Sequence, residues 1–98
     1  MSASLSTHVL DTAAGRPAAG VAVELLRGDE EVGAAQTDAD GRARLAAGLE
    51  PGVYRLVFHP PSTFFRRVEL EVVIDDEGRH YHVPLLVSSY SCASYRGS

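Results

Sequence analysis

Histidines at strand-like spacing are the residues of this chain best suited to acid–base chemistry. His80 and His82 stand two residues apart near the C-terminal end, and His8 lies close to the N-terminal end. Histidine titrates near neutral pH, so each imidazole can accept or donate a proton in a reaction. Judged by alternation alone, a solvent-exposed strand histidine without a catalytic role is the commoner interpretation.

An arginine and the chain end supply a second set of candidate groups. Arg42 directly follows an Asp-Ala-Asp-Gly turn, and its guanidinium can hold a carbonyl or an oxyanion through two parallel hydrogen bonds. The last four residues are Tyr95, Arg96, Gly97 and Ser98. They combine an aromatic ring, a glycine that permits close backbone approach, and a hydroxyl beside the terminal carboxylate. The alternative is an ordinary exposed arginine and an ordinary polar terminus.

Two other chemistries deserve comparison. The pair His80 and His82 could bind zinc, with His8 as a third ligand, because a catalytic zinc site requires three protein ligands. No carboxylate or cysteine at suitable spacing supports this site, so we expect no metal. The single cysteine, Cys92, has no evident partner for a nucleophilic role, and a structural thiol is the favoured interpretation.

Alternating apolar and polar residues predict seven or eight short strands and no helix. The predicted strands cover residues 5–10, 21–27, 32–37, 42–45, 53–59, 68–74, 80–87 and 90–95, with turns rich in glycine, proline and aspartate between them. Short strands at this spacing are typical of an all-β, antiparallel sandwich of two sheets. The 98 residues form one domain, 1–98.

Alternation also predicts which face each strand buries. In the strand at 80–87, the odd-numbered residues form the apolar set, which leaves His80 and His82 on the opposite face. In residues 53–58 we expect Tyr54, Leu56 and Phe58 to face the core and Val57 to face outward. In residues 68–74, the even-numbered residues are expected to face inward.

Composition excludes several classes of protein. A net charge of -4 without a basic cluster argues against nucleic-acid binding, and no apolar run reaches the ~20 residues that cross a bilayer. The first residues lack the features of a signal peptide, and one cysteine suits a reducing compartment. We therefore expect a cytoplasmic protein.

Three sequence blocks resemble the 5-hydroxyisourate hydrolase family, the transthyretin-like enzymes of urate breakdown. They are LSTHVLDT at 5–12 with the following GRPAAGV, TDADGR at 37–42, and HYHVPLL at 80–86 with the terminal YRGS. The resemblance implies a transthyretin-like sandwich of two four-stranded sheets. It also implies hydrolysis of 5-hydroxyisourate to 2-oxo-4-hydroxy-4-carboxy-5-ureidoimidazoline, a homotetramer, and no cofactor or metal.

The same resemblance implies roles for particular residues. His8 and His82 match the family's catalytic histidines, and Arg42 matches an arginine that contacts substrate. The terminal residues Tyr95, Arg96, Gly97 and Ser98 match residues that line the active site. His80 is interpreted as a supporting residue, and His59, which lies in no block, as a surface residue.

One departure and two alternatives complete the sequence-based interpretation. The segment between Phe58 and Val68 is shorter than the family's, which often carries a short helix there. Transthyretin itself carries small molecules without hydrolysing them, so a binding module of the same fold is the main alternative. A purely structural β-sandwich domain would explain the strands but not the residues of the chain end.

Overall fold

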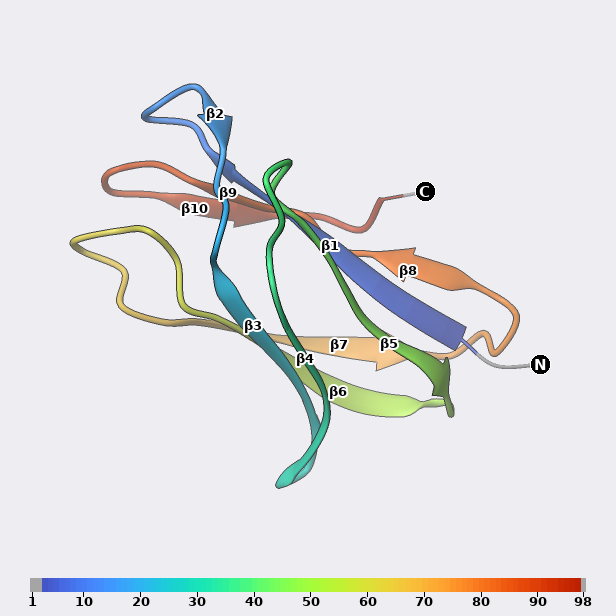
Figure 1. Ribbon diagram of the computed structural model, residues 1–98. Helices are drawn as coiled ribbons and strands as arrows, with labels where there is room; N and C mark the ends of the chain where they lie inside the picture. Colours follow the sequence, from blue (N-terminus) through green and yellow to red (C-terminus); the bar gives the residue numbers. More distant parts are fainter. Residues whose placement is uncertain (1–2, 98) are drawn as a thin grey trace.

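The computed structural model describes residues 3–97, and in that part of the chain ten strands and no helix are found (Figure 1). The strands are β1 (Ala3–Asp11), β2 (Arg16–Pro17), β3 (Ala22–Arg27), β4 (Glu30–Gln36), β5 (Arg42–Leu49), β6 (Gly52–Phe58), β7 (Val68–Ile74), β8 (His80–His82), β9 (Leu85–Val87) and β10 (Cys92–Ser94). No helix that could span a membrane occurs among these residues.

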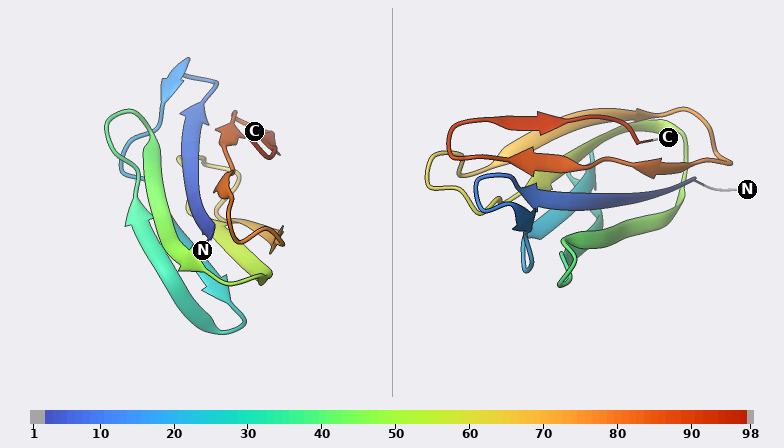
Figure 2. Two further views of the ribbon diagram at one scale, coloured as in Figure 1. Left: turned by 90° about the vertical axis from the view of Figure 1, so that its right-hand side faces the viewer. Right: turned by 90° about the horizontal axis from the view of Figure 1, so that it is seen from above.

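The strands form two sheets that pack face to face, as the two views of Figure 2 show. One sheet has the order β4-β3-β6-β7, and all its neighbours are antiparallel. In the other, β1 lies at the centre, pairing with β5 on one side and with β8 and β9 on the other, while β10 pairs with β9 and the short β2 with one end of β1. This confirms the all-β, transthyretin-like sandwich of two sheets. The expected two four-stranded sheets and seven or eight strands are corrected, because the β1-centred sheet has six strands: the strand expected over 80–87 is divided into β8 and β9, and a two-residue strand, β2, is added.

The predicted antiparallel pairing holds for most strand pairs, and β1 is the exception. This strand runs parallel to β8 and to β9, with Ser6 opposite His82 and Leu10 opposite Leu86. Side-chain alternation identifies the two faces of a strand, but it carries no information about the direction of the neighbouring strand. The first and the late strands of the chain meet only when the sandwich closes.

The strand expected over residues 80–87 is interrupted at Pro84, which has no N–H to donate to the sheet. Its register against β1 is the same on both sides of the interruption. The backbone N–H of Val83 donates to the carbonyl of Ser6 at 2.9 Å, and the buried hydroxyl of Thr7 donates to the carbonyl of Val83 at 2.6 Å. The hydroxyl of Thr7 therefore supplies a hydrogen bond between β1 and Val83 at the point where Pro84 has no N–H to donate.

Apolar residues from both sheets meet in one core, and most expected faces are confirmed. Tyr81, Val83, Leu85 and Val87 are all buried, as are Tyr54, Leu56 and Phe58. Of the inward set of β7 only Ile74 is fully buried, because β7 is an edge strand of its sheet. The rest of that set, Val68, Leu70 and Val72, is half-buried against the core.

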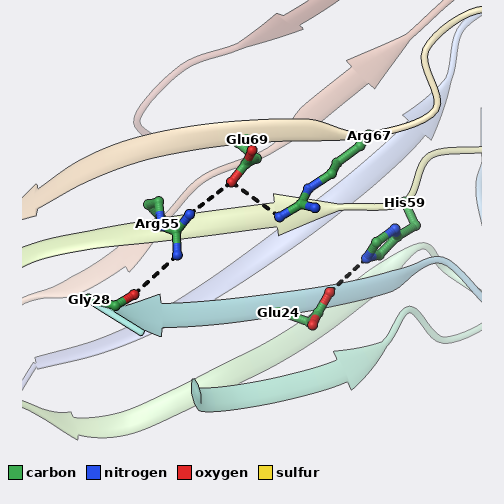
Figure 3. Close-up of polar contacts among 6 residues, drawn as sticks. All are labelled: Glu24, Gly28, Arg55, His59, Arg67 and Glu69. Carbon is green, nitrogen blue, oxygen red and sulfur yellow. Dashed lines mark hydrogen bonds and ion pairs between the residues drawn. The ribbon is translucent and has the colours of Figure 1, made fainter. Parts of the chain in front are cut away.

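Val57 is a second departure, because it faces outward from β6 as predicted and yet is only 1% exposed. Its cross-strand neighbours are Glu24 on β3 and Glu69 on β7. Figure 3 shows these carboxylates engaged by His59 and by two arginines. The stems of long charged side chains can cover apolar surface while their charged ends stay in water, and this explains the burial of Val57.

We predict that Thr7→Val destabilises the protein by about 1–3 kcal/mol, since valine keeps the shape of threonine and leaves the buried carbonyl of Val83 without its hydroxyl partner. Urea unfolding at one fixed protein concentration measures the change. Thr63→Val, at an exposed position, is the matched control and should shift the free energy of unfolding by less than about 0.5 kcal/mol. Equal shifts for the two variants would contradict this account of the β8–β9 junction.

Candidate functional site

Polar side chains from three neighbouring strands gather on the outward face of the β1-centred sheet. Residues two apart in a strand point to the same side of the sheet, so Ser6 and His8 of β1 lie on one face. Their cross-strand partners on β5 and β8 point to that same face. On β5 the partner of His8 is Arg42, and that of Ser6 is Arg44. On β8 the partner of Ser6 is His82. The register of β1 therefore brings together the histidines and arginines of three distant segments.

A tight turn over residues 38–42 sets the position of Arg42. One carboxylate oxygen of Asp38 accepts the backbone N–H groups of Asp40 at 2.9 Å and of Arg42 at 3.0 Å. Gly41 has a φ of 77°, and a Cβ at this position would lie 2.4 Å from the carbonyl oxygen of Val9. Only glycine fits both the left-handed backbone and the close approach, so the turn and β1 are locked together at the start of β5.

His8 is held against the same turn. Its Nε2 lies 2.8 Å from the backbone carbonyl oxygen of Asp40. A carbonyl oxygen can only accept, so Nε2 of His8 carries the hydrogen of this bond. In neutral His8 the lone pair is therefore on Nδ1, and this nitrogen is the one that could accept a proton.

His82 forms its hydrogen bond through Nδ1, whereas His8 uses Nε2. Its Nδ1 lies 3.0 Å from the hydroxyl oxygen of Ser6, and Nε2 has no hydrogen-bond partner within residues 3–97. Burial lowers the pKa of His82 below 6.5, and the nearby His8, His80 and Arg42 lower this pKa further. At neutral pH His82 is therefore an uncharged imidazole, the form that can act as a base.

The chain end lies directly beside His82. The backbone N–H of Gly97 donates to the carbonyl of His82 at 2.7 Å, and the two residues form an isolated antiparallel bridge. A Cβ on Gly97 would lie 3.0 Å from Cδ2 of the His82 ring and 3.2 Å from its Cβ. Any side chain at residue 97 would therefore displace either the chain end or the imidazole.

A surface cavity of about 540 Å³ opens over this face. Its walls are formed by Ser6, Thr7, Asp38, Arg42, Ala43, Arg44, His80 and His82. Arg44 and Ser6 were not singled out in the sequence, although Arg44 stands two residues from Arg42 and so shares its strand face. With two guanidiniums against one carboxylate, the cavity favours an anionic or carbonyl-rich ligand.

Not all the candidate residues come together in this cavity. His8 lies at the neighbouring turn, while Tyr95 and Arg96 line a different cavity of about 320 Å³. That second cavity is mainly apolar and lies between β7 and the C-terminal segment, with Leu70, Val72 and Tyr81 in its walls. Ser98 lies outside the described residues. Of the three terminal residues that the structure describes, Gly97 is the one found next to His82.

The alternative sites gain no support from the geometry. Within residues 3–97 no three histidine, cysteine, aspartate or glutamate side chains are arranged to hold a metal ion. Burial raises the pKa of the Cys92 thiol, which disfavours the thiolate that a nucleophile requires.

His59 is on the other sheet, where its Nε2 pairs with a carboxylate oxygen of Glu24 at 2.6 Å (Figure 3).

Comparison with known proteins places this fold and face in context. Residues 5–97 match the HIUase/Transthyretin family. A Caulobacter vibrioides protein named 5-hydroxyisourate hydrolase is 44% identical, over 96% of this chain and 97% of that protein. The structure of Klebsiella pneumoniae 5-hydroxyisourate hydrolase is similar with a TM-score of 0.86 and 37% identity over 100% of both chains. Sea bream transthyretin, solved with thyroxine, has a TM-score of 0.83 and 27% identity over 95% of this chain and 93% of its own.

The Caulobacter alignment also bears on chain length. It runs over 114 positions, whereas this chain has 98 residues, so at least 16 of those positions have no residue here. The connection between β6 and β7, residues 59–67, is a loop without a helix.

We predict that an NMR titration of the histidine rings will find the pKa of His82 below 6.5. Arg42→Gln should raise this pKa, because removal of a nearby cation makes the protonated imidazole less unfavourable. Burial still acts in the variant, so we expect only part of the shift to be lost. Arg55→Gln, on the outer face of the other sheet, is the control and should leave His82 unchanged. A wild-type pKa at or above 6.5 would contradict the assignment of His82 as the neutral imidazole.

Proposed function

The chain belongs to the HIUase/Transthyretin family, and from this premise we propose that it hydrolyses 5-hydroxyisourate. The observation that carries the proposal is the gathering of His8, Arg42 and His82 on one sheet face, in a chain 44% identical to a protein of that name. The proposed product is 2-oxo-4-hydroxy-4-carboxy-5-ureidoimidazoline, formed by opening the six-membered ring of the substrate.

In the proposed reaction His82 is the general base. A base must be uncharged at the working pH, and the pKa of His82 is lowered below its usual value of 6.5. Its free Nε2 can remove a proton from water as the water oxygen bonds to the ring carbonyl carbon. His8, which donates from Nε2 to the Asp40 carbonyl, retains Nδ1 as a second polar contact for water or substrate.

Arg42 is proposed to stabilise the negative charge that develops on the carbonyl oxygen. The turn over residues 38–42 holds its backbone in place before substrate arrives, and preorganised donors of this kind stabilise a transition state most effectively. As the tetrahedral intermediate collapses, the ring C–N bond breaks and the leaving nitrogen takes a proton. Arg44, on the same wall of the cavity, adds a second cation for substrate binding.

The chain end lies beside the proposed site, next to His82. Gly97 carries this part of the proposal, because its backbone is hydrogen-bonded to His82. Tyr95, Arg96 and Ser98 remain proposed substrate contacts by their match to the family ending. In the single chain Tyr95 and Arg96 line the neighbouring, mainly apolar cavity.

We further propose that the protein is a homotetramer. The cavity over β1, β5 and β8 is open in the single chain, and both β7 and β10 are edge strands with unpaired backbone on one side. A domain of 98 residues buries only a modest core by itself, so association would stabilise it.

Activity is tested by the decay of freshly generated 5-hydroxyisourate, followed by ultraviolet absorbance with and without the protein. We expect clear acceleration over the spontaneous rate. His82→Ala should lower kcat by about 10²–10⁴-fold through loss of the base, and Arg42→Ala by about 10²–10³-fold through loss of oxyanion stabilisation.

The matched control for Arg42→Ala is Arg55→Ala, which removes an arginine from the outer face of the other sheet and should keep full activity. Near-normal kcat in both His8→Ala and His82→Ala would show that the proposed mechanism is wrong. A folded wild-type protein without any acceleration would instead favour a small-molecule binding module of the same fold as the transthyretin solved with thyroxine.

Light scattering coupled to size-exclusion chromatography tests the assembly. One chain has a mass of 10.5 kDa, so a tetramer should give about 42 kDa. A single species of one or two chains at micromolar concentration would overturn the tetramer while leaving the activity assay unaffected.

A further inference from the structure

A chain of side-chain hydrogen bonds runs from His82 to the surface of the protein. The hydroxyl oxygen of Ser6 lies 3.0 Å from Nδ1 of His82 and 2.8 Å from Nε2 of His80. Nδ1 of His80 lies in turn 2.5 Å from the hydroxyl oxygen of Ser4. His82 is half-buried and His80 is exposed, so this chain connects the cavity wall with solvent.

Counting hydrogens leaves two arrangements for this chain when both imidazoles are neutral. In the first, His82 donates from Nδ1 to Ser6, Ser6 donates to Nε2 of His80, and His80 donates from Nδ1 to Ser4; Nε2 of His82 then has a free lone pair. In the second, every donor and acceptor is exchanged, and Nε2 of His82 carries a hydrogen. Reversal of the chain therefore converts His82 from a base into an acid at the same atom.

The charges around His82 oppose any lasting protonation of its ring. Arg42, His8 and His80 all act to lower its pKa, and Arg44 lines the same cavity. Asp38 is the carboxylate in that wall, and one of its oxygens is occupied by two backbone N–H groups of the turn. When His82 accepts a proton from water, transfer of a proton from its ring to another group is therefore favoured over retention of the imidazolium.

We infer that Ser6 is a positioning residue that relays protons between His82 and His80 during catalysis, with exposed His80 exchanging protons with solvent. This inference rests on the proposed function. It identifies a role for a hydroxyl group and for the second histidine of the His-Tyr-His sequence, neither of which touches the reacting atoms.

The relay balances in protons and charge. As the water oxygen bonds to the ring carbonyl carbon, one water proton passes to Nε2 of His82, and the Nδ1 proton of His82 passes to Ser6. The original hydroxyl proton of Ser6 passes to Nε2 of His80, which releases its Nδ1 proton to Ser4 or to water. When the ring C–N bond breaks, Nε2 of His82 gives its proton to the leaving nitrogen, Ser6 returns a proton to Nδ1 of His82, and Nε2 of His80 returns one to Ser6. Nδ1 of His80 takes back one proton from Ser4 or water, which restores the first arrangement.

The kinetic test compares Ser6→Ala with Ser6→Thr, because threonine retains a hydroxyl and is well suited to a strand. We expect Ser6→Ala to lower kcat by about 10- to 100-fold with KM changed less than about twofold, and Ser6→Thr to recover most of the loss. Ser89→Ala, at an exposed serine of the β9–β10 connection, is the matched control and should retain wild-type kcat. Wild-type kcat in Ser6→Ala would overturn the inference.

A proton inventory separates a relay from simple support of the imidazole. In mixtures of H₂O and D₂O, the wild-type kcat should depend on deuterium fraction along a curve, since several protons move together. In Ser6→Ala the dependence should become linear. A lowered kcat with an unchanged curved dependence would show that Ser6 only orients His82, and would also overturn the relay.

Nitrogen-15 NMR of the substrate-free protein tests the hydrogen-bond chain without any enzymatic assay. Ser6→Ala should shift both Nδ1 of His82 and Nε2 of His80, whereas Ser4→Ala should shift chiefly His80. Unchanged shifts in Ser6→Ala would overturn the relay even if the wild-type enzyme is active. Correct shifts in a protein that does not accelerate 5-hydroxyisourate decay would show instead that the proposed function is wrong.

Discussion

The pairing of β1 with β5 on one side and β8 on the other is the constraint on which the candidate site depends. Antiparallel pairing sets His8 opposite Arg42, and parallel pairing sets Ser6 opposite His82. A slip of one residue in either register would turn the β1 side chains to the core face. The buried hydroxyl of Thr7 holds β1 to the β8–β9 junction, and the Gly41 turn packs closely against Val9 of β1 at the start of β5.

The two outward faces of the sandwich use charge in different ways. On the β3-β6-β7 face, Arg55 and Arg67 both contact Glu69, and His59 contacts Glu24, so positive groups meet carboxylates (Figure 3). On the β5-β1-β8 face, imidazoles and guanidiniums lie together with little compensating negative charge. Such an arrangement favours the neutral form of His82 and a negatively charged or polarised ligand, whereas paired surface charges chiefly cover apolar side chains such as Val57.

Much of the fold could be predicted from the sequence because strand alternation is a local property. The residues that face the core in β6 and at 81–87 follow from that pattern, and the strand at 68–74 has the predicted bounds. The interruption at Pro84, the parallel direction of β8 and the burial of Val57 could not be predicted in the same way. Each depends on a neighbouring strand that lies far away in the sequence.

The sequence by itself determined the alternation of faces, the glycine turn before Arg42, and the residue types that mark the family. Only the tertiary structure decided which of these residues meet: His82 lies beside Gly97 and Ser6, whereas Tyr95 and Arg96 line another cavity. The physical reason is that faces and turns arise from covalent geometry within a few residues. Distances between β1, β5, β8 and the chain end are set by sheet register and packing, which exist only after the chain has closed into two layers.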